Sequence, residues 1–173
     1  MTRSPGILAA VSLLLLAPAA LAAPAAPAAS APPAAPPLDL TPYAGRVVYV
    51  DFWASWCAPC KASLPWLEEL QRRRAGEGLT VLLVNVDRDR KAAEAMLAKA
   101  GITLPVTWDP DGKLAKAYAL EGMPSSFVYG RDGTLRDRHV GFDPRREDEL
   151  EGSLAALLAE RPGRATDGKE GGK

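Results

Sequence analysis

Apolar runs that alternate with amphipathic segments predict a repeating order of strands and helices along this chain. The runs at residues 47–53 and 79–86 are almost uninterrupted, which is typical of central strands in a parallel sheet. Between them, residues 61–74 carry leucines at helical spacing and predict a helix, which Pro65 is expected to kink. A strand, a helix and a second strand in this order predict a right-handed crossover connection.

The second half of the chain continues this alternation and closes with a hairpin and a helix. The predicted elements are a helix at 92–100, a strand at 104–108, a short helix at 114–118, a strand that begins within 122–127, its hairpin partner at 135–142 and a helix at 144–160. Turn sequences at 109–112 and 131–133 separate some of them. The whole pattern predicts an α/β domain with a central mixed sheet and helices on both sides.

The segments that flank this domain differ from it in composition. Residues 1–22 combine a positive start, an apolar stretch and a small-residue pattern, which together predict a secretory signal peptide. An uncleaved anchor is disfavoured, because the stretch is shorter than the roughly 20 residues of a spanning helix and contains Pro18. Residues 23–37 are nearly all alanine and proline and predict an extended tether, and the polar residues 161–173 predict a disordered tail. The folded domain is therefore expected at 38–160.

Composition and charge narrow the choice of partners. The chain has 173 residues, 47% of them hydrophobic and 24% charged, which suits one globular domain with tails. Its formal net charge of zero, from 21 basic and 21 acidic residues, gives no electrostatic argument for a nucleic-acid or anionic-membrane partner. The arginine runs at 72–74 and 145–146 are therefore interpreted as solvated helix faces.

The only two cysteines, Cys57 and Cys60, stand where the first strand passes into the first helix. The first turn of a helix has unpaired backbone N–H groups and a partial positive charge, which favour an anion. Such a position in a Cys-x-x-Cys pair lowers a thiol pKa from about 8.5 into the range of about 3.5–7.5. Cys57 is therefore expected to be the exposed nucleophile. Cys60, one turn later, is expected to be the more buried thiol that resolves a mixed disulfide.

The same cysteine spacing is also half of a zinc site. The chain offers no second half, since it has no other cysteine and a single histidine, His139, far along the sequence. His139 lies in a polar stretch and is interpreted as an exposed strand residue rather than a ligand or catalyst. No metal or cofactor is expected to be required.

Several motifs identify a family. They are Asp-Phe-Trp-Ala-Ser-Trp-Cys-Ala-Pro-Cys at 51–60, Pro65 in the cysteine helix, Gly-Met-Pro at 122–124 and Gly141 after the last strand. Over residues 38–160 the chain resembles the thioredoxin superfamily, and most closely its secreted TlpA/ResA-like thiol-disulfide oxidoreductases. The helix at 92–100 with the strand at 104–108 resembles the insertion that separates TlpA-like proteins from plain thioredoxin. The resemblance implies a thioredoxin-like fold with the active site at the end of the first strand.

The resemblance also implies a docking groove for substrates. It implies a cis peptide bond between Met123 and Pro124, a form that X-Pro bonds take at a cost of only about 0.5–1 kcal/mol. The Met123 backbone can then pair with an extended substrate chain. Trp56, beside the nucleophile, is interpreted as apolar docking surface, and Pro59 and Gly141 are expected to complete the binding site.

Two departures from the family pattern concern acidic residues. Many TlpA/ResA-like sequences carry a glutamate where this chain has Ser63. Asp51 matches the buried acid of thioredoxin, but Leu83 occupies the position of the lysine that usually accompanies it. Burial without a cation raises a carboxyl pKa by as much as about 3–5 units, so Asp51 is expected to titrate near neutral pH and relay a proton to or from Cys60.

The sequence thus predicts a periplasmic enzyme that exchanges dithiols and disulfides with proteins. We expect a monomeric reductant of the cytochrome c maturation or copper-site assembly type, because no histidine separates Cys57 from Cys60. Its electrons would come from a membrane donor of the DsbD or CcdA type. The alternative is a metallochaperone-like module in which the same two thiolates hold Cu(I), a soft ion that suits them.

Overall fold

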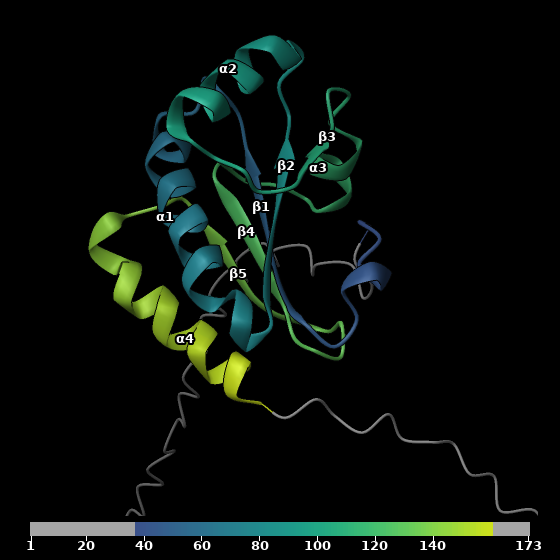
Figure 1. Cartoon of the computed structure of the whole chain (residues 1–173). Coiled ribbons are helices and arrows are strands. Elements are labelled where there is room, and N and C mark those ends of the chain that lie inside the picture. The colour runs from purple at the N-terminus through teal and green to yellow at the C-terminus, as the bar shows by residue number, and fades with distance from the viewer. Residues whose placement is uncertain (1–36, 161–173) are drawn as a thin grey trace, which may run out of the picture.

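The structure, a computed structural model, describes residues 37–160, which form a five-stranded sheet with helices on both faces (Figure 1). The elements in chain order are the 3-10 helix η1 (Thr41–Tyr43), β1 (Val47–Trp53), α1 (Ala58–Arg74), η2 (Ala75–Glu77), β2 (Leu79–Asn85), α2 (Arg90–Ala100), β3 (Val106–Trp108), α3 (Lys113–Ala117), β4 (Ser125–Tyr129), β5 (Leu135–Val140), η3 (Pro144–Arg146) and α4 (Glu147–Ala159). The predicted signal peptide, the tail and nearly all of the tether lie outside the described residues. No helix within 37–160 is long and apolar enough to cross a membrane.

The sheet is mixed, as the sequence predicts, and its strand order is β3-β2-β1-β4-β5. Strand β1 lies at its centre, parallel to β2 and antiparallel to β4, while β3 extends the parallel part and β5 the antiparallel part. Every residue of β1 is buried. The end of β1, from which the cysteine helix starts, therefore has a rigid support on both sides.

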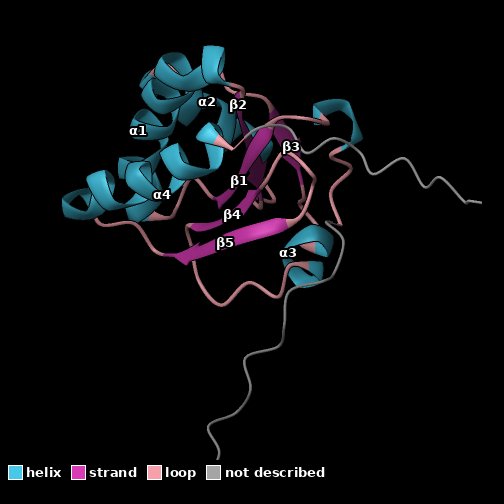
Figure 2. Cartoon of the chain, turned by 90° about the horizontal axis from the view of Figure 1, so that it is seen from below, coloured by secondary structure: helices cyan, strands magenta, loops and turns pink. Residues whose placement is uncertain are grey.

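Helices cover both faces of the sheet, with α1, α2 and α4 on one face and α3 on the other (Figure 2). The alternation of side chains along β1 divides the core between them. Its apolar odd-numbered residues pack with Leu67 of α1 and Leu154 of α4, and its even-numbered residues pack with Tyr118 and Phe127. Asp51 is the polar exception on the α1 face of the strand.

All four α-helices begin elsewhere than the sequence analysis predicts. Helix α1 begins at Ala58 rather than residue 61 and α3 at Lys113 rather than residue 114, and capping side chains explain the differences at α2 and α4. Helix α2 starts at Arg90 rather than residue 92, because the Asp89 carboxylate accepts a hydrogen bond from the N–H of Lys91. Residues 144–146 form η3 rather than the first turn of α4, with Asp143 accepting from the N–H of Arg145. The kink expected at Pro65 stays a prediction, and the helix assignment runs through that residue.

Three strands are shorter than predicted, β2 by one residue only, since it ends at Asn85 rather than residue 86. Strand β3 begins at Val106 rather than residue 104, since Pro105 has no N–H to give to the ladder. Strand β5 ends at Val140 rather than residue 142. The next residue, Gly141, has a φ of +82°, a left-handed conformation that turns the chain out of the sheet.

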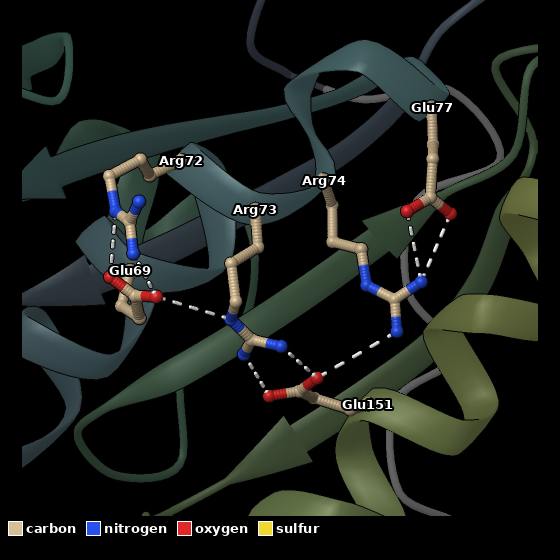
Figure 3. A network of polar contacts seen from close by, with 6 residues as sticks. All are labelled: Glu69, Arg72, Arg73, Arg74, Glu77 and Glu151. Atoms are coloured by element: carbon tan, nitrogen blue, oxygen red, sulfur yellow. Dashed lines mark hydrogen bonds and ion pairs between the residues drawn. The ribbon is translucent and has the colours of Figure 1, made fainter.

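The arginine run at 72–74 lies on a largely solvent-exposed helix face, as interpreted from the sequence, and it also ties α1 to α4 (Figure 3). Arg73 donates to both carboxylate oxygens of Glu151 in α4, and its Nε lies 3.4 Å from Glu69. Arg74 lies 3.9 Å from the same Glu151 and pairs with Glu77 at 3.0 Å. The network is partly shielded, since the Glu151 side chain is only 19% exposed.

Candidate active site

The two cysteines form a disulfide at the start of α1. Cys57 is the N-cap residue of the helix, with extended φ and ψ, and its Cα lies 5.3 Å from that of Cys60. The Cys57 Sγ accepts a hydrogen bond from the backbone N–H of Cys60 at 3.3 Å. An orphan donor of the first helical turn thus points at the sulfur, which is where a thiolate would gain from it.

Cys60 is buried as the sequence analysis expects, whereas Cys57 is more enclosed than expected. Cys57 is 6% exposed and Cys60 is fully buried, so their predicted order is confirmed. The expectation that Cys57 is an exposed residue is wrong for this disulfide form. The reason is that Cys57 belongs to the buried core cluster of β1 and α1, although it also lines one groove with Trp56, Pro59 and Met123.

That groove has a volume of about 610 Å³ and gathers residues from separate segments. Three residues expected to bind substrate, Trp56, Pro59 and Met123, line it. Trp56 is 66% exposed, unusual for so large an apolar side chain. The sequence analysis missed the other lining residues, which come from the end of β2, from α3 and from the loop before β4: Val86, Ala115, Leu120, Glu121 and Gly122. Of these only Gly122 had a signal, as part of the Gly-Met-Pro motif.

The peptide bond between Met123 and Pro124 is cis, which confirms the expectation. Pro124 is buried and does not line the groove, and its carbonyl accepts a hydrogen bond of 2.7 Å from the N–H of Gly141. Gly141 also lies outside the groove, in the lining of a separate cavity of about 290 Å³. Gly141 therefore holds Pro124 through this backbone hydrogen bond, whereas Met123 is the residue of this loop that lines the groove beside Cys57.

Asp51 is buried without a cation, as expected. It is 1% exposed, its strand neighbour on β2 is Leu83, and its neighbour on β4 is Ser126. The Ser126 hydroxyl donates to Asp51 Oδ1 at 2.7 Å, while Oδ2 has no hydrogen-bond partner among the described residues. Burial raises the pKa of Asp51 to about 7, although the hydrogen bond from Ser126 lowers it in part.

The structure also places Ser63 and His139, the two other polar residues that the sequence analysis considers near or apart from the site. Ser63 is buried, and its hydroxyl donates to the carbonyl oxygen of Cys60 at 3.2 Å, so it serves the helix backbone. His139 lies on β5 as predicted, but it is half-buried rather than exposed, with Nε2 3.1 Å from Asp137. No group of three or more potential ligand side chains that could hold a metal occurs within residues 37–160.

The fold and this site together define the class of protein to which the chain belongs. A mixed sheet flanked by helices, a Cys-x-x-Cys disulfide capping a helix after the central strand, and a cis-proline loop sharing its groove are features of thioredoxin-like dithiol proteins. The family described as Redoxin matches residues 21–154, and the chain belongs to this family.

Named relatives agree with that membership. The chain is 30% identical over 97 residues to the thiol-disulfide oxidoreductase ResA of Geobacillus thermodenitrificans, covering 56% of each chain. It is 26% identical over 120 residues to ResA of Bacillus thuringiensis, covering 69% of this chain and 68% of the relative. The resemblance to TlpA/ResA-like members of the thioredoxin superfamily is confirmed.

Solved structures confirm the fold. A crystal structure assigned as a thiol:disulfide interchange protein DsbE from Chlorobium tepidum shares 39% identity at a TM-score of 0.67, covering 69% of this chain and 84% of that one. StoA from Bacillus subtilis shares the fold at a TM-score of 0.57 and 24% identity, covering 66% of this chain and 86% of that one.

Proposed function

We propose that this chain is a thiol-disulfide oxidoreductase that exchanges its Cys57–Cys60 pair with protein thiols and disulfides. The observation that carries the proposal is the placement of the disulfide at the N-terminus of α1, in one groove with Trp56 and Met123. A structural disulfide gains nothing from a docking groove beside it. The relatives named ResA and DsbE support the same activity.

In the proposed reaction the reduced protein passes two electrons to a substrate disulfide. The Cys57 thiolate attacks one substrate sulfur, forming a mixed disulfide and expelling the other sulfur as a thiolate. The N–H of Cys60, which points at Cys57 Sγ, stabilises the attacking charge. The Cys60 thiolate then attacks Cys57 Sγ, which releases the second substrate thiolate and forms the internal disulfide.

Asp51 is proposed to serve the second step as a general base. Its pKa of about 7 lets the carboxylate accept a proton from Cys60 and return it in the reverse direction near neutral pH. Both side chains lie in the core region between β1 and α1, where bulk water cannot carry the proton. The Ser126 hydroxyl holds the carboxyl in place.

Substrate chains are proposed to dock in extended form across the groove. The cis bond before Pro124 presents the Met123 backbone for pairing with that chain, and the exposed Trp56 ring supplies apolar contact. Pro59 adds apolar surface to the groove beside Trp56, while the backbone hydrogen bond between Gly141 and Pro124 holds the loop that contains Met123.

The proposed setting is the periplasm, with the protein acting as a monomeric reductant in cytochrome c maturation or copper-site assembly. The signal-peptide pattern at residues 1–22 and the similarity to a DsbE-type protein support it. A reductant in an oxidising compartment needs electrons from across the membrane, so a donor of the DsbD or CcdA type is part of the proposal.

Trapping tests this function directly. The Cys60→Ser variant cannot resolve the mixed disulfide, so its substrate should stay attached to Cys57 and be released by a small thiol. The matched Cys57→Ser variant should trap nothing. Reduction of insulin disulfides without added metal should require both cysteines, whereas stoichiometric Cu(I) binding with no turnover would replace this proposal with the copper-binding alternative.

A further inference from the structure

A buried carboxylate, Asp87, lies immediately behind the turn that carries the nucleophile. Asp87 is 5% exposed and stands two residues after the end of β2. Its Oδ2 accepts from the backbone N–H of Ser55 at 2.7 Å, and its Oδ1 accepts from the Ser55 hydroxyl at 2.9 Å. The side chain of Asn85 donates to Oδ2 at 2.8 Å.

These contacts fix two walls of the groove relative to each other. Ser55 is the second residue of a turn closed by the bond from the N–H of Cys57 to the carbonyl of Ala54, at 3.1 Å. On the other side, Asn85 Oδ1 accepts from the N–H of Asp87 at 3.0 Å. The residue between these two, Val86, lines the groove and donates to the carbonyl at the end of β1.

Three donors, all neutral, satisfy the Asp87 carboxylate, and it forms no ion pair within the described part of the chain. The Cα of Cys57 is at most about 7 Å from that of Ser55, because only two peptide units separate them. The charge is therefore bonded to the backbone two residues before Cys57, and it is shielded from water because Asp87 is buried. Other charged side chains around the turn are Lys61 and Lys99, which line a cavity shared with Ser55, and Glu121, which lines the groove.

We infer that Asp87 is a positioning residue that fixes the Cys57 turn and, through its negative charge, opposes formation of the Cys57 thiolate. This inference rests on the proposed oxidoreductase function and deepens it. A thiolate that is less stabilised makes the reduced dithiol a better electron donor, so Asp87 biases the site toward reduction of its substrates.

The test compares Asp87→Asn with Ser55→Ala in the full chain. Asp87→Asn removes the charge and keeps the size of the side chain, so the pKa of Cys57 should fall by about one unit. Its dithiol-disulfide equilibrium constant against a reference thiol couple should shift about tenfold toward the dithiol, which corresponds to about 30 mV. Ser55→Ala keeps the charge and removes one donor to it, so the pKa of Cys57 should stay unchanged or rise.

Three readouts separate the outcomes: the pH dependence of Cys57 alkylation, the equilibrium constant, and the free energy of unfolding. If Asp87→Asn lowers only the unfolding free energy, Asp87 is a structural cap and the inference fails. If both variants lower the pKa of Cys57 equally, a loosened turn and not the charge is responsible, and the inference also fails. A wild-type protein that exchanges with no thiol couple would instead refute the proposed function itself.

Discussion

At the scale of single residues, the neighbours of one carboxyl decide its acidity. The resemblance to thioredoxin predicts that Asp51 is buried with Leu83 in the place of the usual lysine, and the parallel register of β1 with β2 pairs these two residues. It could not predict the hydrogen bond from Ser126, since that contact depends on the pairing of β1 with a strand 75 residues away in the chain. The sequence therefore predicts that the pKa of Asp51 is raised, but it does not predict that the hydrogen bond from Ser126 lowers this pKa in part.

Replacing Asp51 by Asn should change the pH dependence of stability. Below about pH 3.8 the carboxyl is protonated in both the unfolded and the folded protein, so it contributes no pH dependence. As the pH rises toward about 7 the unfolded state loses the proton first, and the wild type loses stability on the order of 4 kcal/mol. The variant escapes this loss, although the N–H groups of its new amide cost about 1–3 kcal/mol where they lack partners.

The free energy of unfolding of the Asp51→Asn variant should therefore depend less on pH than that of the wild type between about pH 4 and pH 7. Urea unfolding of the oxidised proteins should show that the variant is the more stable above pH 7, by about 1–3 kcal/mol, and that it is the less stable near pH 4, where the wild type has not yet lost stability and the amide still costs about 1–3 kcal/mol. Parallel stability profiles for the two proteins would show that the pKa of Asp51 is not raised.

Removing the Ser126 hydroxyl should displace the proton transfer to higher pH. The hydrogen bond from Ser126 lowers the pKa of Asp51, so Ser126→Ala should raise that pKa further above about 7. Asp51 would then be protonated, and unable to accept a proton from Cys60, up to a higher pH. Stopped-flow measurement of resolution should show a rate profile displaced to higher pH, with unchanged attack by Cys57. A profile that stays in place would mean that another group takes the proton.

At the scale of elements, the hydrophobic pattern predicts the order of strands and helices but not how their ends are tied. Arg131, in the turn between β4 and β5, shows the difference. Its guanidinium donates to the carbonyls of Gly45, Glu77, Leu158 and Glu160, at 2.8–3.1 Å. These carbonyls belong to separate segments of the chain, so no local pattern around Arg131 could reveal that it joins them.

Arg131→Ala should destabilise the fold by about 2–3 kcal/mol, because the partly buried carbonyl of Leu158 and three more exposed carbonyls lose a charged donor. Arg131→Lys should recover only part of this loss, since an ammonium cannot reach four diverging carbonyls as a planar guanidinium does. Chemical denaturation measures both. The matched control is Arg72→Ala, which removes a side chain that is 72% exposed and, within residues 37–160, pairs with Glu69 alone, and it should change stability by less than about 1 kcal/mol. Equal effects of the two alanine variants would contradict the role given to Arg131.

At the scale of the whole molecule, the groove is the feature that the sequence revealed least. Its cysteine wall follows from one motif, Trp-Cys-Ala-Pro-Cys, and its Met123 wall from another. Val86, which follows β2, and Ala115, which lies in α3, line the groove as well. They do so because the fold brings both elements next to the end of β1. Such convergence depends on strand order, which short-range patterns do not contain.

The whole site should make the protein a reductant, with a potential nearer the roughly −270 mV of thioredoxin than the roughly −120 mV of strong periplasmic oxidants. The two residues between the cysteines, Ala58 and Pro59, are neutral, so the Cys57 thiolate is stabilised by the helix terminus without a cation between the cysteines. Equilibration with graded thiol-disulfide buffers, followed by tryptophan fluorescence, measures the potential. Pro59→His is the matched variant, because an imidazolium between the cysteines would stabilise the thiolate and make the potential less negative, by about 30 mV for each tenfold change in the equilibrium constant. A wild-type potential already near the oxidant end would reverse the proposed direction of electron flow, and the Pro59→His substitution would then have little left to add.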